Sequence, residues 1–262
     1  MTKAQPKRVV SLIASATEMV CALGARDLLV GRSHECDFPP DVTRLPSLTE
    51  PKFPVTGTSY DIDARVKAIL QEGLSVYRVD PEKLQALRPD IIVTQDHCEV
   101  CAVSLKDVES ALCAWGGLRV EIVSLQPDSL ADIWEDITKV SRALGRERQG
   151  DRLVEQLKAR MASIAEQSGA AQTRPRVASG FDMARTLQEM PLLERRPGWH
   201  ALKAVQRDRV FVADGNHYFN RTGPRIVESL EILAEIFHPE LFPSQYEGKG
   251  WMRYTAEPRV EN

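Results

Sequence analysis

Hydrophobic positions in the first half of the chain form short apolar runs separated by segments with helical spacing. Buried strands are predicted at residues 9–13, 28–30, 90–94 and 118–125. Helices are predicted at residues 15–23, 62–70, 81–87 and 103–115. Strands that alternate with helices indicate a parallel sheet covered on both faces. We therefore predict an α/β domain over residues 1–126, with ligands bound beyond the carboxyl ends of its strands.

Two local features refine this first domain. Ser15-Ala16-Thr17-Glu18 fits a capping box, in which Ser15 caps the helix and Glu18 reaches back to the Ser15 amide. Residues 34–54 are rich in proline and lack periodicity, so we expect an irregular surface loop there.

A long helical pattern follows over residues 127–168. Its apolar positions recur at helical spacing: Leu130, Ile133, Ile137, Val140 and Leu144, then Leu153, Leu157, Met161 and Ile164. Gly145 and Gly150 each weaken a helix by about 1 kcal/mol, so one long helix and two abutting helices both stay open. We assign residues 127–170 to a connecting helix.

The last third of the chain carries a shorter α/β pattern. A strand is expected at 176–178, a helix at 197–205, a strand at 209–213 and a helix at 224–237. We assign residues 171–244 to a small second domain and residues 245–262 to a C-terminal tail. A span of this length is at the low end for an independent domain, typically about 50–250 residues.

Composition excludes several partners. Hydrophobic residues make up 43% and charged residues 27%, and the formal net charge is −3, so no basic field is available for nucleic acid. No window approaches the roughly 18 apolar residues of a spanning helix, so membrane insertion is not expected. The apolar run before Glu18 is too short for a secretory signal, and five cysteines suit a reducing compartment. A cytoplasmic protein is therefore expected, with a periplasmic location as the alternative.

Two loops carry residues that could bind metal. His34-Glu35-Cys36-Asp37-Phe38 and Asp96-His97-Cys98-Glu99-Val100-Cys101 each follow a predicted strand, so both should open on the same edge of the sheet. Thiolates with imidazole suit zinc or another thiophilic metal. We expect His34, Cys36, Cys98 and Cys101 to approach one another as metal ligands. The alternative is a loop with ordinary free cysteines.

A third loop combines aromatic, amide and charged side chains after the strand at 209–213. Such a mixture suits a large planar ligand, although a loop packed under the last helix has the same composition. The candidate ligand-binding residues are His34, Cys36, Asp37, Phe38, Tyr60, Asp96, His97, Asn216, His217, Tyr218, Phe219 and Arg221. No nucleophile elbow, phosphate loop or dinucleotide motif is present, so no catalytic residue is assigned. A small metal-dependent or thiol-redox enzyme that uses Cys98 and Cys101 with His34 and Cys36 stays open as the alternative.

Several stretches of the chain match the pattern of a known family. Two of them are Arg8-Val9-Val10-Ser11-Leu12 with Ala16-Thr17-Glu18, and Leu84-Gln85-Ala86-Leu87-Arg88-Pro89-Asp90-Ile91-Ile92. The first resembles the start, and the second a strand entry, of the vitamin B12 (cobalamin) and iron-chelate binding proteins of ABC importers. The segments His34-Glu35-Cys36-Asp37 and Cys98-Glu99-Val100-Cys101 are similar to a branch without signal peptides. The likeness continues at Gly180-Phe181-Asp182, Pro197-Gly198-Trp199, Val212–Asn216 and His238–Phe242.

The resemblance implies a helical-backbone metal receptor fold, with two α/β lobes joined by one long helix. It implies non-enzymatic binding of a corrinoid or related metal chelate and an ABC transporter permease as partner. It also implies that Glu82 docks onto transporter arginines. Arg176-Val177-Ala178 and Ser179-Gly180-Phe181-Asp182 resemble segments that the family separates by several elements. The second lobe is therefore expected to be truncated, and apolar surface exposed by the truncation would favour self-association.

Overall fold

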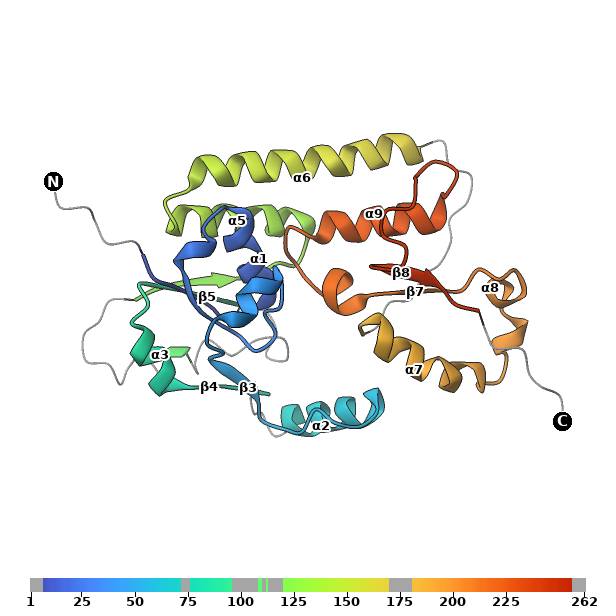
Figure 1. The fold of residues 1–262 in the computed structure, drawn as a ribbon, viewed down its shortest axis with the longest axis horizontal. Coiled ribbons are helices and arrows are strands. Elements are labelled where there is room, and N and C mark those ends of the chain that lie inside the picture. Colours follow the sequence, from blue (N-terminus) through green and yellow to red (C-terminus); the bar gives the residue numbers. More distant parts are fainter. Residues whose placement is uncertain are drawn as a thin grey trace. The chain divides into compact units, whose positions relative to one another are not determined.

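The computed structural model describes residues 7–71, 76–95, 108–109, 112, 120–169 and 181–255. The chain forms two compact units (Figure 1). Met1–Gln156 with Thr222–Pro224 make up the first unit, and Leu157–Arg221 with Arg225–Asn262 make up the second. No helix within the described residues is long and apolar enough to cross a membrane.

The first unit is built on the predicted parallel sheet. Its strands are β1 (Val9–Ser11), β2 (Leu29–Arg32), β5 (Ile91–Gln95) and β6 (Glu121–Leu125), in the spatial order β2-β1-β5-β6. Every neighbouring pair in this sheet is parallel. The α/β prediction is confirmed, because the continuous apolar runs at these positions are what a strand buried on both faces requires.

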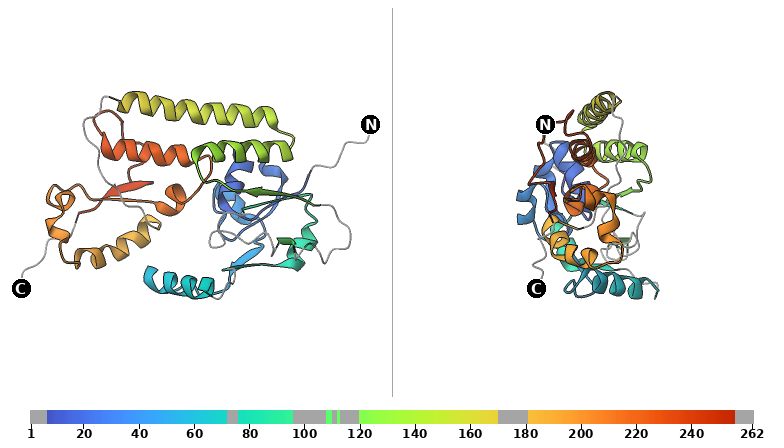
Figure 2. Two further views of the ribbon diagram at one scale, coloured as in Figure 1. Left: turned by 180° about the vertical axis from the view of Figure 1, so that it is seen from behind. Right: turned by 90° about the vertical axis from the view of Figure 1, so that its right-hand side faces the viewer.

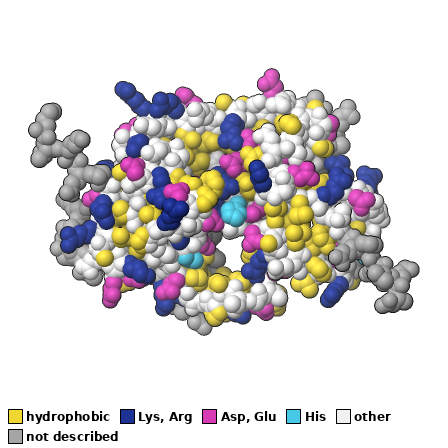
Figure 3. Space-filling model, in the orientation of Figure 1, with side chains coloured by type: hydrophobic (Ala, Val, Ile, Leu, Met, Phe, Trp, Pro, Cys, Tyr) yellow, Lys and Arg dark blue, Asp and Glu magenta, His cyan; other side chains and the backbone are white. Residues whose placement is uncertain are grey.

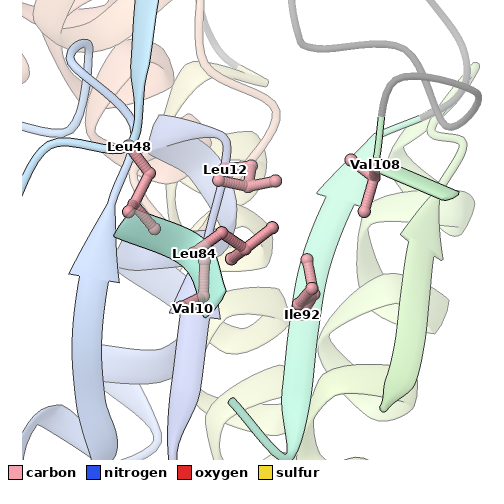
Figure 4. Close-up of a cluster of buried hydrophobic side chains, with 6 residues drawn as sticks. All are labelled: Val10, Leu12, Leu48, Leu84, Ile92 and Val108. Atoms are coloured by element: carbon pink, nitrogen blue, oxygen red, sulfur yellow. The ribbon is translucent and has the colours of Figure 1, made fainter. Parts of the chain in front are cut away.

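Helices cover both faces of this sheet. Figure 1 shows α1 (Ala14–Ala22) and α5 (Leu130–Ala143) on one side and α3 (Pro81–Leu87) on the other. On the α3 side, buried side chains from both strands and helices meet in one cluster: Val10, Leu12, Leu48, Leu84, Ile92 and Val108 (Figure 4). Alternate strand positions point to the opposite face, so each strand contributes to two cores.

The first helix begins differently from the capping-box prediction. Helix α1 starts at Ala14 with Ile13 as the N-cap, and no side chain makes a capping hydrogen bond. Ser15 and Glu18 are both buried within the helix. The capping-box prediction is wrong because this helix start lies inside the core, where its side chains meet other elements.

The loop predicted at 34–54 and its surroundings contain more regular structure than expected. A 3₁₀ turn, η2, covers Pro40–Arg44, and β3 (Thr49–Pro51) pairs antiparallel with β4 (Tyr77–Val79). The segment that connects β3 to β4 in the sequence contains α2 (Ser59–Gln71), at the position where helical spacing predicts a helix. A shorter 3₁₀ turn, η1, covers Arg26–Leu28 just before β2.

The connecting helix is divided in two. Helix α5 ends at Ala143 and α6 (Glu147–Ser168) follows after a turn in which Gly145 has a φ of +66°. Glycine suits this left-handed turn because a Cβ would be strained there. Gly150 lies against Ser141 of α5, so closely that a Cβ on Gly150 would collide with that serine. Of the two alternatives, two helices are therefore confirmed.

Helix α6 is continuous across the boundary between the units at Gln156 and Leu157. Its sequence position therefore matches the connecting role that the family resemblance implies.

The second unit has a small antiparallel sheet of β7 (Phe211–Ala213) and β8 (Trp251–Arg253). Figures 1 and 2 show α9 (Ile226–Phe237) on one side of it and α7 (Met183–Glu194) on the other. The predicted helix at 197–205 is a 3₁₀ turn, η3 (Trp199–Ala201), followed by α8 (Lys203–Gln206). Residues assigned to a C-terminal tail form β8, whereas the strand expected at 176–178 lies outside the described residues.

Candidate functional site

The loops after β1 and β2 meet at the carboxyl edge of the first unit's sheet. The amide of Ser33 donates to the carbonyl of Ser11 over 2.8 Å, which closes the edge just beyond both strands. Thr49, from β3, donates its hydroxyl to Ser33 Oγ over 2.9 Å. The predicted His34–Phe38 segment therefore starts from a fixed, hydrogen-bonded position.

His34 is held by Thr49. The backbone amide of His34 donates to Thr49 Oγ1 over 3.0 Å, and ring Nδ1 lies 2.7 Å from the same oxygen. The ring packs on Tyr77 with a centroid distance of 5.0 Å. Burial, and then the nearby charge of Arg32, lower the pKa of His34 from its ordinary value of 6.5. The neutral imidazole is thus favoured, which is the form that can coordinate a metal.

Cys36 is a core thiol. Its side chain is 1% exposed, and Sγ lies 3.0 Å from the hydroxyl of Thr17 on α1. Burial raises the pKa of the Cys36 thiol to about 11. Only the thiolate is a strong ligand or nucleophile, so this environment disfavours both roles predicted for Cys36.

The remaining first-unit candidates differ in exposure, and four of them are not described by the structure. Phe38 is 36% exposed and Tyr60, at the start of α2, is 80% exposed, while Asp37 is half-buried. Asp96, His97, Cys98 and Cys101 lie outside the described residues. Among the described residues, no group of three or more His, Cys, Asp and Glu side chains is placed to hold a metal ion.

The loop after β7 contains an ordered carboxylate–imidazole pair. Asp214 caps the π-helical turn η4 (Gly215–Phe219) by accepting the amide of His217 over 2.8 Å. Its second oxygen, Oδ2, lies 2.8 Å from Nδ1 of the same histidine. The His217 side chain is 40% exposed, so one carboxylate fixes both the backbone and the ring of a solvent-facing histidine. Coordinating histidines in proteins are oriented by this kind of pair.

The other candidates on this loop partly serve to hold it. Arg221 is buried and donates from Nε to the Asn216 carbonyl over 2.8 Å. The Tyr218 ring lies 4.4 Å from the guanidinium carbon of Arg225 and 6.0 Å from the Tyr246 ring. Tyr218 and Phe219 also pack against the core of the second unit. The loop therefore packs at its base, as one of the two alternatives describes, and it leaves His217 and Asn216 accessible to solvent, while binding of a planar ligand stays a prediction.

Glu82 is the last of the predicted site residues. Glu82 is exposed in the first turn of α3, next to the Asp80 side chain that caps the helix. Asp214 and Thr49 were not selected from the sequence, although each holds a selected histidine. The role of Asp214 could be predicted from the sequence, because an aspartate that follows a strand and lies three residues before His217 fits a helix-capping pattern.

Comparison with known proteins assigns the family. A family model described as periplasmic binding protein matches residues 9–183. The chain belongs to the periplasmic binding protein family. A Bacillus subtilis member, the uncharacterized ABC transporter substrate-binding lipoprotein YvrC, is 23% identical over 292 residues, which cover 92% of this chain and 82% of YvrC.

Solved structures place this periplasmic binding protein among similar folds. A periplasmic heme binding protein from Pseudomonas aeruginosa has a TM-score of 0.66 at 18% identity, covering 97% of this chain and 100% of the other. The periplasmic vitamin B12 binding protein BtuF of Vibrio cholerae has a TM-score of 0.58 at 18% identity, covering 88% of this chain and 96% of BtuF. The helical-backbone metal receptor fold implied by the sequence resemblance is thereby confirmed.

The expectation of a cytoplasmic protein is contradicted by these relatives. YvrC is described as a lipoprotein, and the two solved proteins are described as periplasmic. The cysteine count misled the sequence argument, because a protein with free cysteines need not reside in a reducing compartment. The Cys36 thiol, for example, is packed into the core.

Proposed function

We propose that this chain is the substrate-binding component of an ABC importer and binds a planar metal chelate without transforming it. Cobalamin is the first candidate ligand and heme the second. Family membership and the names of the similar proteins support the class of ligand. The observation that carries the proposal is the Asp214–His217 pair in the loop after β7.

His217 is proposed as an axial ligand to the metal of the chelate. Asp214 holds Nδ1, so Nε2 is the ring nitrogen that would coordinate. The carboxylate also orients the ring before the ligand arrives, which lowers the entropy cost of binding. His34 is the corresponding candidate in the first unit, where Thr49 holds its ring.

The test is a spectroscopic titration with aquocobalamin, cyanocobalamin and hemin, each added separately to the full chain. A metal that exchanges an axial ligand for imidazole changes its visible absorption. We expect His217→Ala to remove this change and to weaken binding by at least about tenfold, the usual cost of losing a positioned metal contact. His200→Ala is the matched control, because His200 is also an exposed histidine of the second unit.

Asp214→Asn separates positioning from coordination. The neutral amide oxygen accepts the Nδ1–H hydrogen bond more weakly than a carboxylate does, so binding should weaken while the axial absorption change persists. The proposal is lost if none of the three chelates binds to folded protein, or if His200→Ala weakens binding as much as His217→Ala.

Import places the binding step outside the cytoplasm, in keeping with the described locations of the relatives. We propose that the loaded protein then docks on a permease through Glu82. Glu82 suits this role because it is exposed in the first turn of α3, a short helix that the Asp80 side chain caps.

A further inference from the structure

The second unit has a groove that the chelate proposal does not use. It has a volume of about 450 Å³ and runs between the β7–β8 sheet and the carboxyl end of α9. Its lining combines basic, aromatic and acidic side chains: Arg207, Arg209, Phe211, Glu235, Ile236, Phe237, Pro239, Glu240, Trp251 and Arg253. None of these residues belongs to the loop 214–221, so the groove is separate from the Asp214–His217 pair.

Three arginines give the lining of the groove a positive charge. Arg207, Arg209 and Arg253 are all exposed, and within the part of the chain that the structure describes none of them forms an ion pair. This local excess of positive charge occurs in a chain whose formal net charge is −3. Arginine presents several donors in a planar fork that fits carboxylate and phosphate oxygens.

The acidic side chains of the lining do not cancel this charge. Glu235 is 4% exposed, and its carboxylate already accepts the Gln245 amide over 2.8 Å and the Trp251 indole over 2.8 Å. Glu240 is solvated and lies 3.7 Å from His238. The lining therefore carries three arginines against two carboxylates, one of which is buried and already hydrogen-bonded.

The wall of the groove is aromatic. Phe211 and Trp251 meet edge to face, with ring centroids 5.7 Å apart. The guanidinium carbon of Arg253 lies 5.7 Å from the centroid of Phe211, so one cation is already placed against the aromatic wall. Sites for small organic molecules combine apolar walls with a few charged groups, in volumes of roughly 300–1,000 Å³.

We propose that this groove binds a small organic anion, in which a phosphate or carboxylate contacts Arg207, Arg209 and Arg253 and an aromatic or apolar body lies against Phe211 and Phe237. The anion is a second ligand, distinct from the chelate. Its phosphate could belong to a soluble monoester or to a lipid headgroup, which share this chemistry.

Phenyl phosphate tests the proposal by calorimetric titration of the full chain, with inorganic phosphate and phenol as the two halves of the probe. We expect phenyl phosphate to bind with a dissociation constant of about 1 mM or tighter, and at least about tenfold more tightly than either half. Vesicles that contain phosphatidylglycerol test separately whether the phosphate of a lipid headgroup also binds. Binding of both phenyl phosphate and the vesicles supports the proposal.

Charge variants locate the site. Arg209→Gln and Arg253→Gln should each weaken phenyl phosphate binding by about tenfold, because each removes a charge-assisted hydrogen bond. Arg195→Gln and Arg196→Gln are matched controls, since both arginines are exposed in the same unit and do not line the groove. The proposal is overturned if phenyl phosphate does not bind, if the control variants lose binding equally, or if only the vesicles bind.

Discussion

His34 makes the stability of the first unit depend on pH. Burial and Arg32 lower its pKa below 6.5, so the folded state binds a proton less readily than the unfolded state. Stability from this residue is therefore complete above the unfolded value and decreases as the pH falls through the folded value. We predict that the midpoint temperature of thermal unfolding of the wild-type chain decreases as the pH is lowered from about 7 to about 5.

The variant His34→Gln isolates this effect. Glutamine does not titrate, so the fall in midpoint over that pH range should be smaller than in the wild type. His200→Gln removes an exposed histidine and should behave as the wild type does. Equal pH profiles for the wild type and His34→Gln would show that the fall has another source.

Cys36 should be chemically inert in the folded protein. Its thiol is buried and its pKa is raised to about 11, so almost none of it is thiolate near neutral pH. We predict that iodoacetamide labels Cys36 only after denaturation, as read by peptide mass spectrometry. Rapid labelling of Cys36 in the native protein would revive the thiol-enzyme alternative, which needs a reactive sulfur.

At the scale of elements, the turn between α5 and α6 depends on close helix contact. An alanine in place of glycine within an isolated helix adds about 1 kcal/mol of stability. At Gly150 the new Cβ would collide with Ser141, and overpacking of this kind costs about 1–3 kcal/mol. We predict that Gly150→Ala lowers the free energy of unfolding, measured by urea denaturation.

A double variant distinguishes the collision from other effects. Ser141→Gly opens the space that the Gly150 Cβ would occupy, so Gly150→Ala should be tolerated better in that background. Additive losses in the double variant would mean that the two residues are not coupled, and that α5 and α6 do not pack through this contact.

Elements with local signals were predictable, and elements defined by distant partners were not. Helix α3 spans the predicted residues because Asp80, Pro81 and the spacing of its leucines all lie within one short segment. Strand β8 has only three residues and is defined by pairing with β7, about forty positions earlier in the sequence. Short strands of this kind carry too little periodicity to stand out from a loop.

The candidate site shows the same division. His217 could be selected as an aromatic, polar residue at a strand end, and the structure places it with Asp214. Cys36 could be selected as a potential ligand, but its burial depends on Thr17 from α1, which no local pattern reveals. Sequence chemistry identifies residue types, whereas tertiary packing decides which of them face solvent.

At the scale of the whole molecule, charges of both signs occur in similar numbers, with 34 basic and 37 acidic residues. On the face seen in Figure 3, basic and acidic side chains are interspersed, without one field of a single sign. The truncated second lobe stays a prediction, as does self-association.

Docking on a permease gives a prediction for the full import cycle. Glu82 is exposed in the first turn of α3, and replacing it with arginine costs the helix only about 0.3–1 kcal/mol through the helix dipole. Folding and chelate binding by Glu82→Arg should therefore match the wild type. Reversal of a charge that docks on basic permease side chains should slow association with the permease strongly.

The measurement is the stimulation of ATP hydrolysis by the chelate-loaded chain, with its importer in proteoliposomes. We expect Glu82→Arg to reduce the stimulation at least about tenfold, and the loss to shrink as ionic strength rises and screens the repulsion. Glu121→Arg makes the same charge reversal at another exposed site of the first unit and should stimulate normally. If both variants stimulate equally, Glu82 does not dock, and the permease must contact this protein through other residues.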